Sequence, residues 1–175
     1  MRPSMRPPLN PRSRQGTSLI EGALFIPVVI LLLLGMMEFG RITYTYYQLQ
    51  KVMYAFARYA GTQQGINLCD TNSDILAQAI AVARTGTGDV TAEPVIQGLL
   101  ASDFRVRIER YNPDTDSIAE CDCSSNGCNT AQGGSAPDYI FVDLANGYPV
   151  TLRIPFLPQD PILLRPSVRI PFGGT

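Results

Sequence analysis

Four cysteines are the residues of this chain with the most direct chemistry. They are Cys69, Cys121, Cys123 and Cys128. A bond between Cys121 and Cys123 would close a very tight ring, so the favoured pairings join Cys128 to one of these two. The other one then bonds to Cys69. The sequence leaves both sets open.

The residue types and their spacing do not indicate a metal site or an enzyme active site. The cysteine spacing is not the paired C-x₂-C pattern of zinc sites. An acidic stretch has the residue type that binds calcium, but its spacing does not fit an EF-hand loop. Its members are Asp114, Asp116, Glu120 and Asp122. The chain has no histidine, which removes histidine-based triads and metal sites. We expect no enzyme activity, no metal and no cofactor.

The charge is distributed unevenly along the chain. Residues 1–16 contain four arginines and no acid, whereas the rest carries 10 basic and 15 acidic side chains. A nucleic-acid-binding protein needs basic charge on its folded part, so we expect no nucleic-acid partner.

The strongest local signal is an apolar run from Gly22 to Met37, in which no residue is charged. Its uniform Leu, Ile and Val content favours a membrane helix, predicted over residues 17–40, over a buried helix of a soluble protein. A cleavable signal would need a small-x-small site after the run, and residues 34–38 do not provide one.

The flanking charges predict the orientation of this membrane helix. Four arginines precede it and Arg41 alone lies just after it. The positive-inside rule therefore predicts a cytoplasmic basic leader over residues 1–16 and an extracytoplasmic domain over residues 41–175. The cysteines would then lie in an oxidising compartment, where disulfides form.

Glu21 is the unusual residue at the edge of the apolar run. A carboxylate at mid-membrane costs roughly 2.5–3.5 kcal/mol, and such residues usually have a partner. Pro27 lies within the run, where it either kinks the helix or loosens it for packing.

The surroundings of Glu21 resemble a prepilin peptidase site: Gly16-Thr17-Ser18-Leu19-Ile20-Glu21 follows a basic leader and precedes a long apolar helix. The wider stretch from Gly16 to Arg58 resembles the TadE-like family of minor pseudopilins from tight-adherence (Flp, type IVb) pilus systems. The matching features are Gly16, Glu21, Pro27, Leu31–Leu34, Glu38-Phe39-Gly40-Arg41 and Ala57-Arg58.

The resemblance implies a structural role in pilus assembly and surface adhesion. It implies cleavage after Gly16 by prepilin peptidase, which would give Thr17 a new α-amino group. In pilins the acid equivalent to Glu21 is held to pair with the N-terminus of an adjacent subunit. Implied partners are the membrane, the peptidase, other pilins or pseudopilins and the assembly machinery, and the implied location is the bacterial inner membrane or the pilus. The alternatives are an uncleaved single-pass anchor with an envelope-binding domain and a secretion-system pseudopilin.

The remaining pattern predicts an α+β domain on a long N-terminal helix. From Ile42 to Ala60, apolar residues recur at spacings of four and three, which indicates an amphipathic extension of the membrane helix. Its other face carries Tyr47, Lys51, Tyr54 and Arg58. A second helix is predicted from a cap at Asn72 or Ser73 to Arg84, and a short one around Val95–Leu100.

Alternating apolar residues predict three antiparallel strands. They are expected at Phe104–Tyr111, Tyr139–Leu144 and Val150–Phe156, with Asn146-Gly147 turning the last two into a hairpin. Residues 112–138 are predicted to be a long polar loop, and the proline-rich C-terminus is predicted to be irregular or edge-like.

Overall fold

The computed structural model describes residues 13–70, 72–153 and 160–173, with side chains described from Leu19 onward. The chain forms two compact units, residues 1–41 with 153–157 and residues 42–152 with 158–175. Helix α1 (Ser13–Thr62) begins in the first unit and ends in the second.

Helix α1 begins one turn earlier than expected. Ser13 to Gly16 are helical, so the helix starts before the predicted residue 17; residues 1–12 lie outside the described part. The sequence explains the early start, because no proline occurs between Pro11 and Pro27 to end the helix. Pro27 itself lies inside α1.

The C-terminal part of α1 supplies one side of the core of the second unit. Six of its residues, spaced along one face, are at most 5% exposed. They are Leu49, Val52, Met53, Phe56, Ala57 and Ala60. The predicted apolar stripe is thus confirmed from Leu49 onward, whereas Tyr46 near its start is exposed.

Helix α2 (Asp74–Thr85) has a capping residue at each end. The Ser73 side chain accepts a hydrogen bond from the Leu76 backbone N–H at 3.3 Å. Gly86 ends the helix in the left-handed region, φ +74°, and donates to the Val82 carbonyl oxygen. Both boundaries agree with the predicted helix to within one or two residues.

The main sheet is antiparallel, with the strand order β2-β1-β3-β6. Its strands are β1 (Phe104–Asn112), β2 (Ser117–Glu120), β3 (Tyr139–Leu144) and β6 (Ser167–Pro171). Strands β1 and β3 confirm two of the three predicted strands, and the α+β class is confirmed. The C-terminus contributes β6 as an edge strand.

The predicted hairpin at Asn146-Gly147 was wrong. A turn does form there, with Gly147 at φ +73°, but β3 has β1 on one side and β6 on the other and so offers no free edge. The chain after the turn instead forms β4 (Tyr148–Val150), which pairs with β5 (Ile162–Leu164) in a separate two-stranded sheet. The predicted strand Val150–Phe156 therefore ends at Val150 within the described residues, and residues 154–159 lie outside them.

Two further local predictions were wrong. Residues 95–100 form turns, and a short 3₁₀ helix, η1 (Ala101–Asp103), follows them. The predicted loop 112–138 contains β2 and a second 3₁₀ helix, η2 (Thr130–Gln132).

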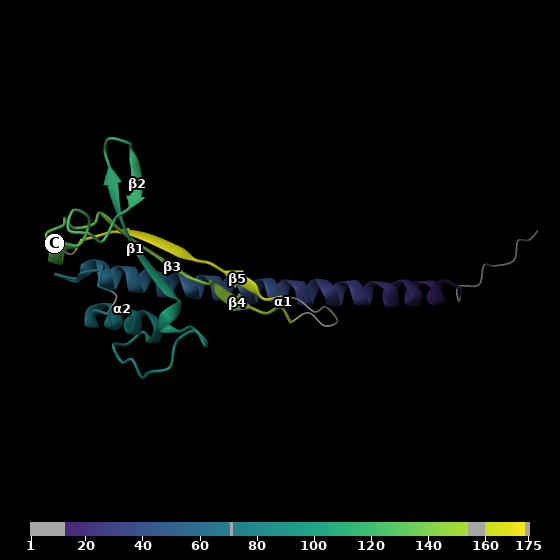
Figure 1. Cartoon of the computed structure of the whole chain (residues 1–175). Helices are drawn as coiled ribbons and strands as arrows, with labels where there is room; N and C mark the ends of the chain where they lie inside the picture. Colours follow the sequence, from purple (N-terminus) through teal and green to yellow (C-terminus); the bar gives the residue numbers. More distant parts are fainter. Residues whose placement is uncertain (1–12, 71, 154–159, 174–175) are drawn as a thin grey trace, which may run out of the picture. The chain divides into compact units, whose positions relative to one another are not determined.

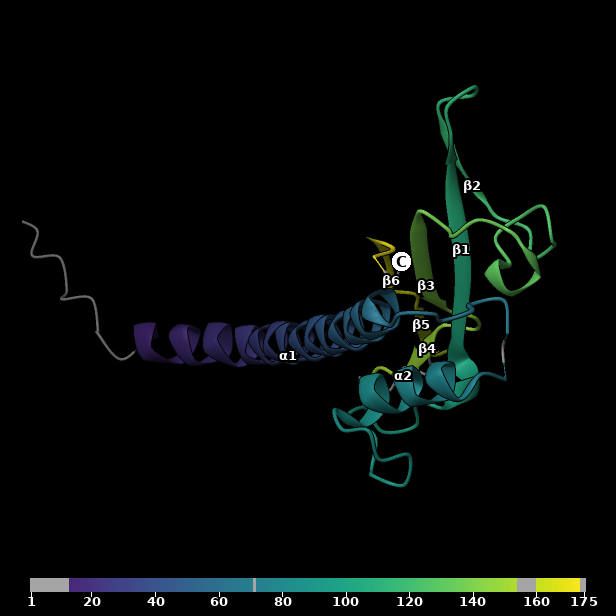
Figure 2. The ribbon, with the colours of Figure 1, turned by 90° about the vertical axis from the view of Figure 1, so that its left-hand side faces the viewer.

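The core lies between one face of the main sheet and the two helices. Phe56 of α1 contacts Phe104 of β1 with ring centroids 5.9 Å apart, and Ile140 and Val142 of β3 are fully buried in the same cluster. Helix α2 lies beside the C-terminal part of α1 (Figure 1) and joins this cluster through residues such as Ala79. Strands β1 and β2 continue as a two-stranded arm beyond β3 and β6 (Figure 2).

Candidate functional site

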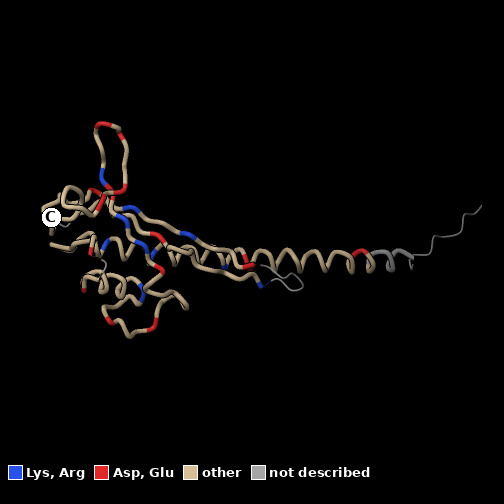
Figure 3. Tube along the Cα trace, viewed as in Figure 1, with Lys and Arg blue, Asp and Glu red and all other residues tan. Residues whose placement is uncertain are grey.

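The N-terminal part of α1 exposes an apolar surface along its length. Its large apolar side chains are roughly half or more exposed, from 76% for Leu19 to 49% for Ile30, except for Leu34, which is partly buried. Between Glu21 and Glu38 the tube of α1 carries no charged residue (Figure 3). Soluble monomers rarely expose apolar surface on this scale, so the helix needs lipid or other apolar helices around it. Its length and composition are sufficient to cross a membrane.

The predicted processing and assembly residues lie at the start of this surface. Gly16 and Thr17 have helical backbone in α1 and side chains outside the described part. Glu21 lies one turn after Thr17 and is exposed. Within the described residues, Glu21 has no ion-pair partner.

An ion pair marks the other end of the apolar surface. Arg41 donates to the Glu38 carboxylate at 2.7 Å, and the Glu38 side chain is only 14% exposed. Pairing lowers the free-energy cost of holding both charges where a membrane helix leaves the apolar region. The sequence reasoning did not identify this pair, although spacing of three on a helix is its ordinary signal.

All four cysteines are disulfide-bonded: Cys69 with Cys123, and Cys121 with Cys128. This is one of the two pairings that the sequence left open. The first bond ties the segment after α1 to the segment after β2, and the second closes a short loop. The Asn67 side-chain amide also donates to Asn129 at 3.2 Å, so the two segments are joined by a hydrogen bond as well.

Two glycines allow the disulfide-bonded loop to pack tightly. A Cβ at Gly127 would collide with the carbonyl oxygen of Asp122, and one at Gly134 would lie 2.6 Å from the carbonyl oxygen of Gly127. Any larger residue at either position would force the backbone apart. The loop is therefore a compact, cross-linked element.

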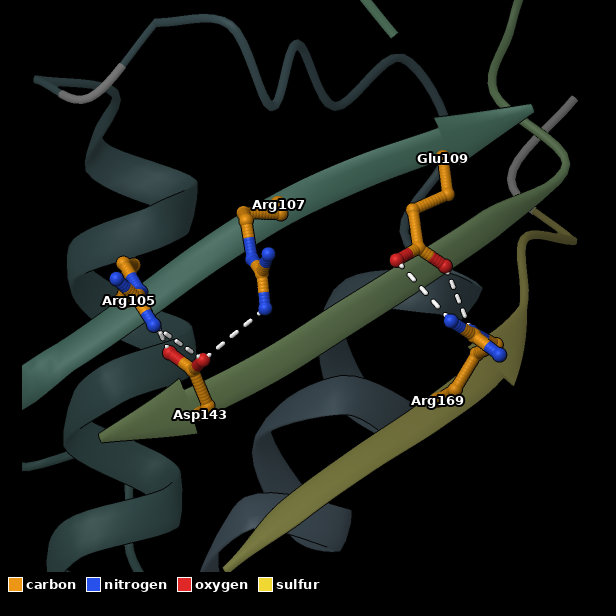
Figure 4. A network of polar contacts seen from close by, with 5 residues as sticks. All are labelled: Arg105, Arg107, Glu109, Asp143 and Arg169. Atoms are coloured by element: carbon orange, nitrogen blue, oxygen red, sulfur yellow. Dashed lines mark hydrogen bonds and ion pairs between the residues drawn. The ribbon is translucent and has the colours of Figure 1, made fainter. Parts of the chain in front are cut away.

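The outer face of the main sheet carries a network of charged residues from three strands (Figure 4). Asp143 of β3 accepts hydrogen bonds from Arg105 at 2.8 and 2.6 Å and from Arg107 at 3.2 Å. These arginines, led by the hydrogen bond from Arg105, outweigh burial and hold the pKa of the Asp143 carboxyl below its ordinary value.

A second pair extends the network to the edge of the sheet. Arg169 of β6 donates to Glu109 of β1 at 2.6 and 3.2 Å across the intervening strand. The ring of Phe141 on β3 lies between the two groups of charges, with Arg107 4.3 Å and Arg169 5.6 Å from its centroid. The network therefore clamps β1, β3 and β6 together on the side that no helix of the core covers.

In the described part of the chain, side chains that could ligate a metal do not cluster. No three His, Cys, Asp or Glu residues come together there as metal ligands. A hollow of about 440 Å³ lies along α2, and its lining includes three alanines, Ile80, Val90, Arg84 and the polar residues Asn72 and Ser73. The acids of the predicted acidic stretch lie on the exposed arm and in the loop that follows it.

An exposed apolar helix continuing into a disulfide-bonded α+β unit defines the class of membrane-anchored proteins with one N-terminal helix. Residues 16–58 match the family model described as TadE-like protein, which confirms the resemblance over that segment. The match indicates a protein associated with a tight-adherence pilus and anchored in a membrane. No curated protein and no solved structure matches the chain significantly.

Proposed function

We propose that this chain is a minor pilin or pseudopilin of a tight-adherence (Flp, type IVb) pilus that takes part in pilus assembly and surface adhesion. It would be inserted in the bacterial inner membrane with its N-terminus in the cytoplasm, cut after Gly16 by prepilin peptidase, and assembled with other pilins. The observation that carries the proposal is the coincidence of the family match, residues 16–58, with the exposed apolar part of α1 and Glu21.

The proposed chemistry of assembly uses Glu21 and a new α-amino group on Thr17. An α-amino group has a pKa near 7.7–8.0, so it is largely cationic at neutral pH. Paired with Glu21 of a neighbouring subunit, it would offset the cost of placing that carboxylate among apolar helices. Such a pair also fixes the axial register of two helices, which lipid contacts alone would not do.

A substitution at Glu21 separates assembly from simple anchoring. With Glu21→Ala, we expect the chain to insert in the membrane at an unchanged level, while surface filaments and adhesion of the host cells fall several-fold. The measurements are the amount of chain in membranes, the yield of sheared filaments and the number of adherent cells. Leu24→Ala is the matched control, because it truncates another exposed side chain of the same helix without removing a charge.

A plain membrane anchor would behave differently. If Glu21→Ala and Leu24→Ala both leave filament yield and adhesion unchanged, the carboxylate has no role in assembly. That outcome would favour a membrane anchor that holds its disulfide-bonded domain at the membrane surface for an envelope ligand.

A further inference from the structure

One face of α1 within the second unit carries an exposed stripe of aromatic and basic residues. It consists of Tyr47, Lys51, Tyr54 and Arg58, all exposed and spaced by four, three and four residues. This spacing places them on one side of the helix, away from the buried stripe that begins at Leu49. We call these four residues the basic stripe.

The basic stripe borders a hollow at the edge of the main sheet. Tyr47, Gln50, Lys51 and Tyr54 line it from α1, Val168 lines it from the edge strand β6, and its volume is about 310 Å³. The site is therefore concave as well as charged, with aromatic rings on its wall.

Among the described residues, no carboxylate forms an ion pair with the basic stripe. There is no Asp or Glu between Glu38 and Asp70. Within the described residues, Lys51 and Arg58 form no ion pair, and Lys51 instead lies over the Tyr47 ring at 4.6 Å. An anionic partner could pair with both cations without breaking an ion pair among the described residues.

The arm formed by β1 and β2 has the complementary chemistry. It carries exposed acids, and the chain has no basic residue between Arg110 and Arg153. The acids of the arm and its continuation are Asp114, Asp116, Glu120 and Asp122. Acidic residues colour both the outer end and the base of the arm in Figure 3. Within the described residues, none of them forms an ion pair.

The arm also presents apolar surface and an ordered tip. Tyr111 and Ile118 are paired across the two strands and are 44% and 39% exposed. The Tyr111 hydroxyl donates to Asp116 at 2.7 Å, and the Asp114 N–H donates to the Asn112 side chain at 2.9 Å. An ordered tip loses less conformational entropy on binding than a flexible one.

We propose that the acidic arm of one copy of this chain docks on the basic stripe of a second copy. Asp114 and Glu120 would face Lys51 and Arg58, and the apolar pair on the arm would enter the hollow between Tyr47 and Tyr54. The two surfaces carry opposite charges, both offer aromatic or apolar contact, and neither forms an ion pair among the described residues of its own chain.

The two surfaces cannot meet within one copy. Strands β2 and β6 are the two edges of the main sheet, with β1 and β3 between them, a separation of about 14 Å at ~4.8 Å per strand. The contact therefore joins two copies, either reciprocally in a two-fold dimer or successively in a row or ring of copies. This inference does not depend on cleavage after Gly16.

Photocrosslinking of the full chain in lipid vesicles tests the contact. A benzophenone amino acid replaces Tyr54, and crosslinked dimers are quantified after illumination and mapped by mass spectrometry. We expect the crosslinked peptide to contain residues 111–120 of the second copy. The yield should fall several-fold in high salt, since screening weakens exposed charge pairs.

Charge reversal identifies the residues responsible. Asp114→Lys with Glu120→Lys should lower the yield several-fold, whereas Glu93→Lys, a change at an exposed acid elsewhere, should leave it unchanged. Lys51→Glu with Arg58→Glu should lower it as well. Mixing the two reversed chains should restore the crosslinking yield, because each arm then faces a stripe of opposite charge. This rescue excludes misfolding as the cause of the loss.

Three results would overturn the proposal. They are a crosslink to lipid or to α1 of the neighbour, the absence of any crosslinked dimer, and a crosslinking yield that stays the same in both charge-reversed variants.

Discussion

Asp143 shows how individual residues hold the outer face of the sheet together. Its side chain is 12% exposed and has two arginines on adjacent β1 positions of the same face. Burial of the Asp143 carboxylate is tolerated only while both arginines pair with it, because a desolvated charge without partners has a high free-energy cost. The alternating pattern of β1 predicted which residues face outward, but it could not predict that Asp143 would meet two of them, since this depends on strand register.

Replacing Asp143 tests this view. Asp143→Asn should lower the free energy of unfolding of the second unit by about 1–2 kcal/mol, a value reduced by the exposure of both arginines. Asp160→Asn, at an exposed acid with no ion pair among the described residues, should change it by less than about 0.5 kcal/mol. Urea unfolding of the full chain in detergent measures both.

The same substitution predicts a pH dependence. The pKa of Asp143 is lowered in the folded chain, so its stabilisation is complete above the unfolded value near ~3.9 and is lost as pH falls through the folded value. Between about pH 5 and pH 2, the wild-type chain should lose stability more steeply than Asp143→Asn. Equal slopes would show that the arginines do not favour the charged form.

At the scale of elements, the disulfides hold together segments that have little apolar packing of their own. The segments they join are largely exposed loops with few apolar side chains. The Cys69–Cys123 bond spans 54 residues and the Cys121–Cys128 bond spans 7. By loop-closure entropy, the longer cross-link restricts the unfolded chain more.

Removing each bond in turn should therefore give unequal losses. Cys69→Ser with Cys123→Ser should cost about 4 kcal/mol, and Cys121→Ser with Cys128→Ser about 2 kcal/mol. Urea unfolding of the two double variants provides the comparison. A larger loss from the shorter bond would mean that native packing around the loop, with Gly127 and Gly134, matters more than chain entropy.

The elements also show what the sequence could predict. Helix α2 was predictable because Ser73 and Gly86 mark its ends, and β1 and β3 were predictable because apolar residues alternate along them. Strand β2 was missed because all its residues are exposed and no apolar alternation marks it. The pairing of β4 with β5 was missed because it is non-local, while Asn146-Gly147 gave a local hairpin signal.

At the scale of the whole molecule, the candidate site combines parts that differ in how far the sequence reveals them. The charge-free run, Glu21 and the resemblance over Gly16 to Arg58 could be identified directly, and the match over residues 16–58 supports them. The sequence could not predict three other features: the choice of disulfide pairing, the Glu38–Arg41 ion pair, and the arm with charges complementary to the basic stripe. These depend on contacts between residues far apart in the chain or on side-chain geometry.

The N-terminus of the mature chain tests the central claim most directly. Intact mass and N-terminal sequencing should be done on the protein from membranes of its native host, with and without active prepilin peptidase. The account predicts a chain that begins at Thr17 when the peptidase is active and at or near Met1 when it is not. A chain that keeps residues 1–16 in the presence of the active peptidase would contradict processing after Gly16 and favour a permanent membrane anchor.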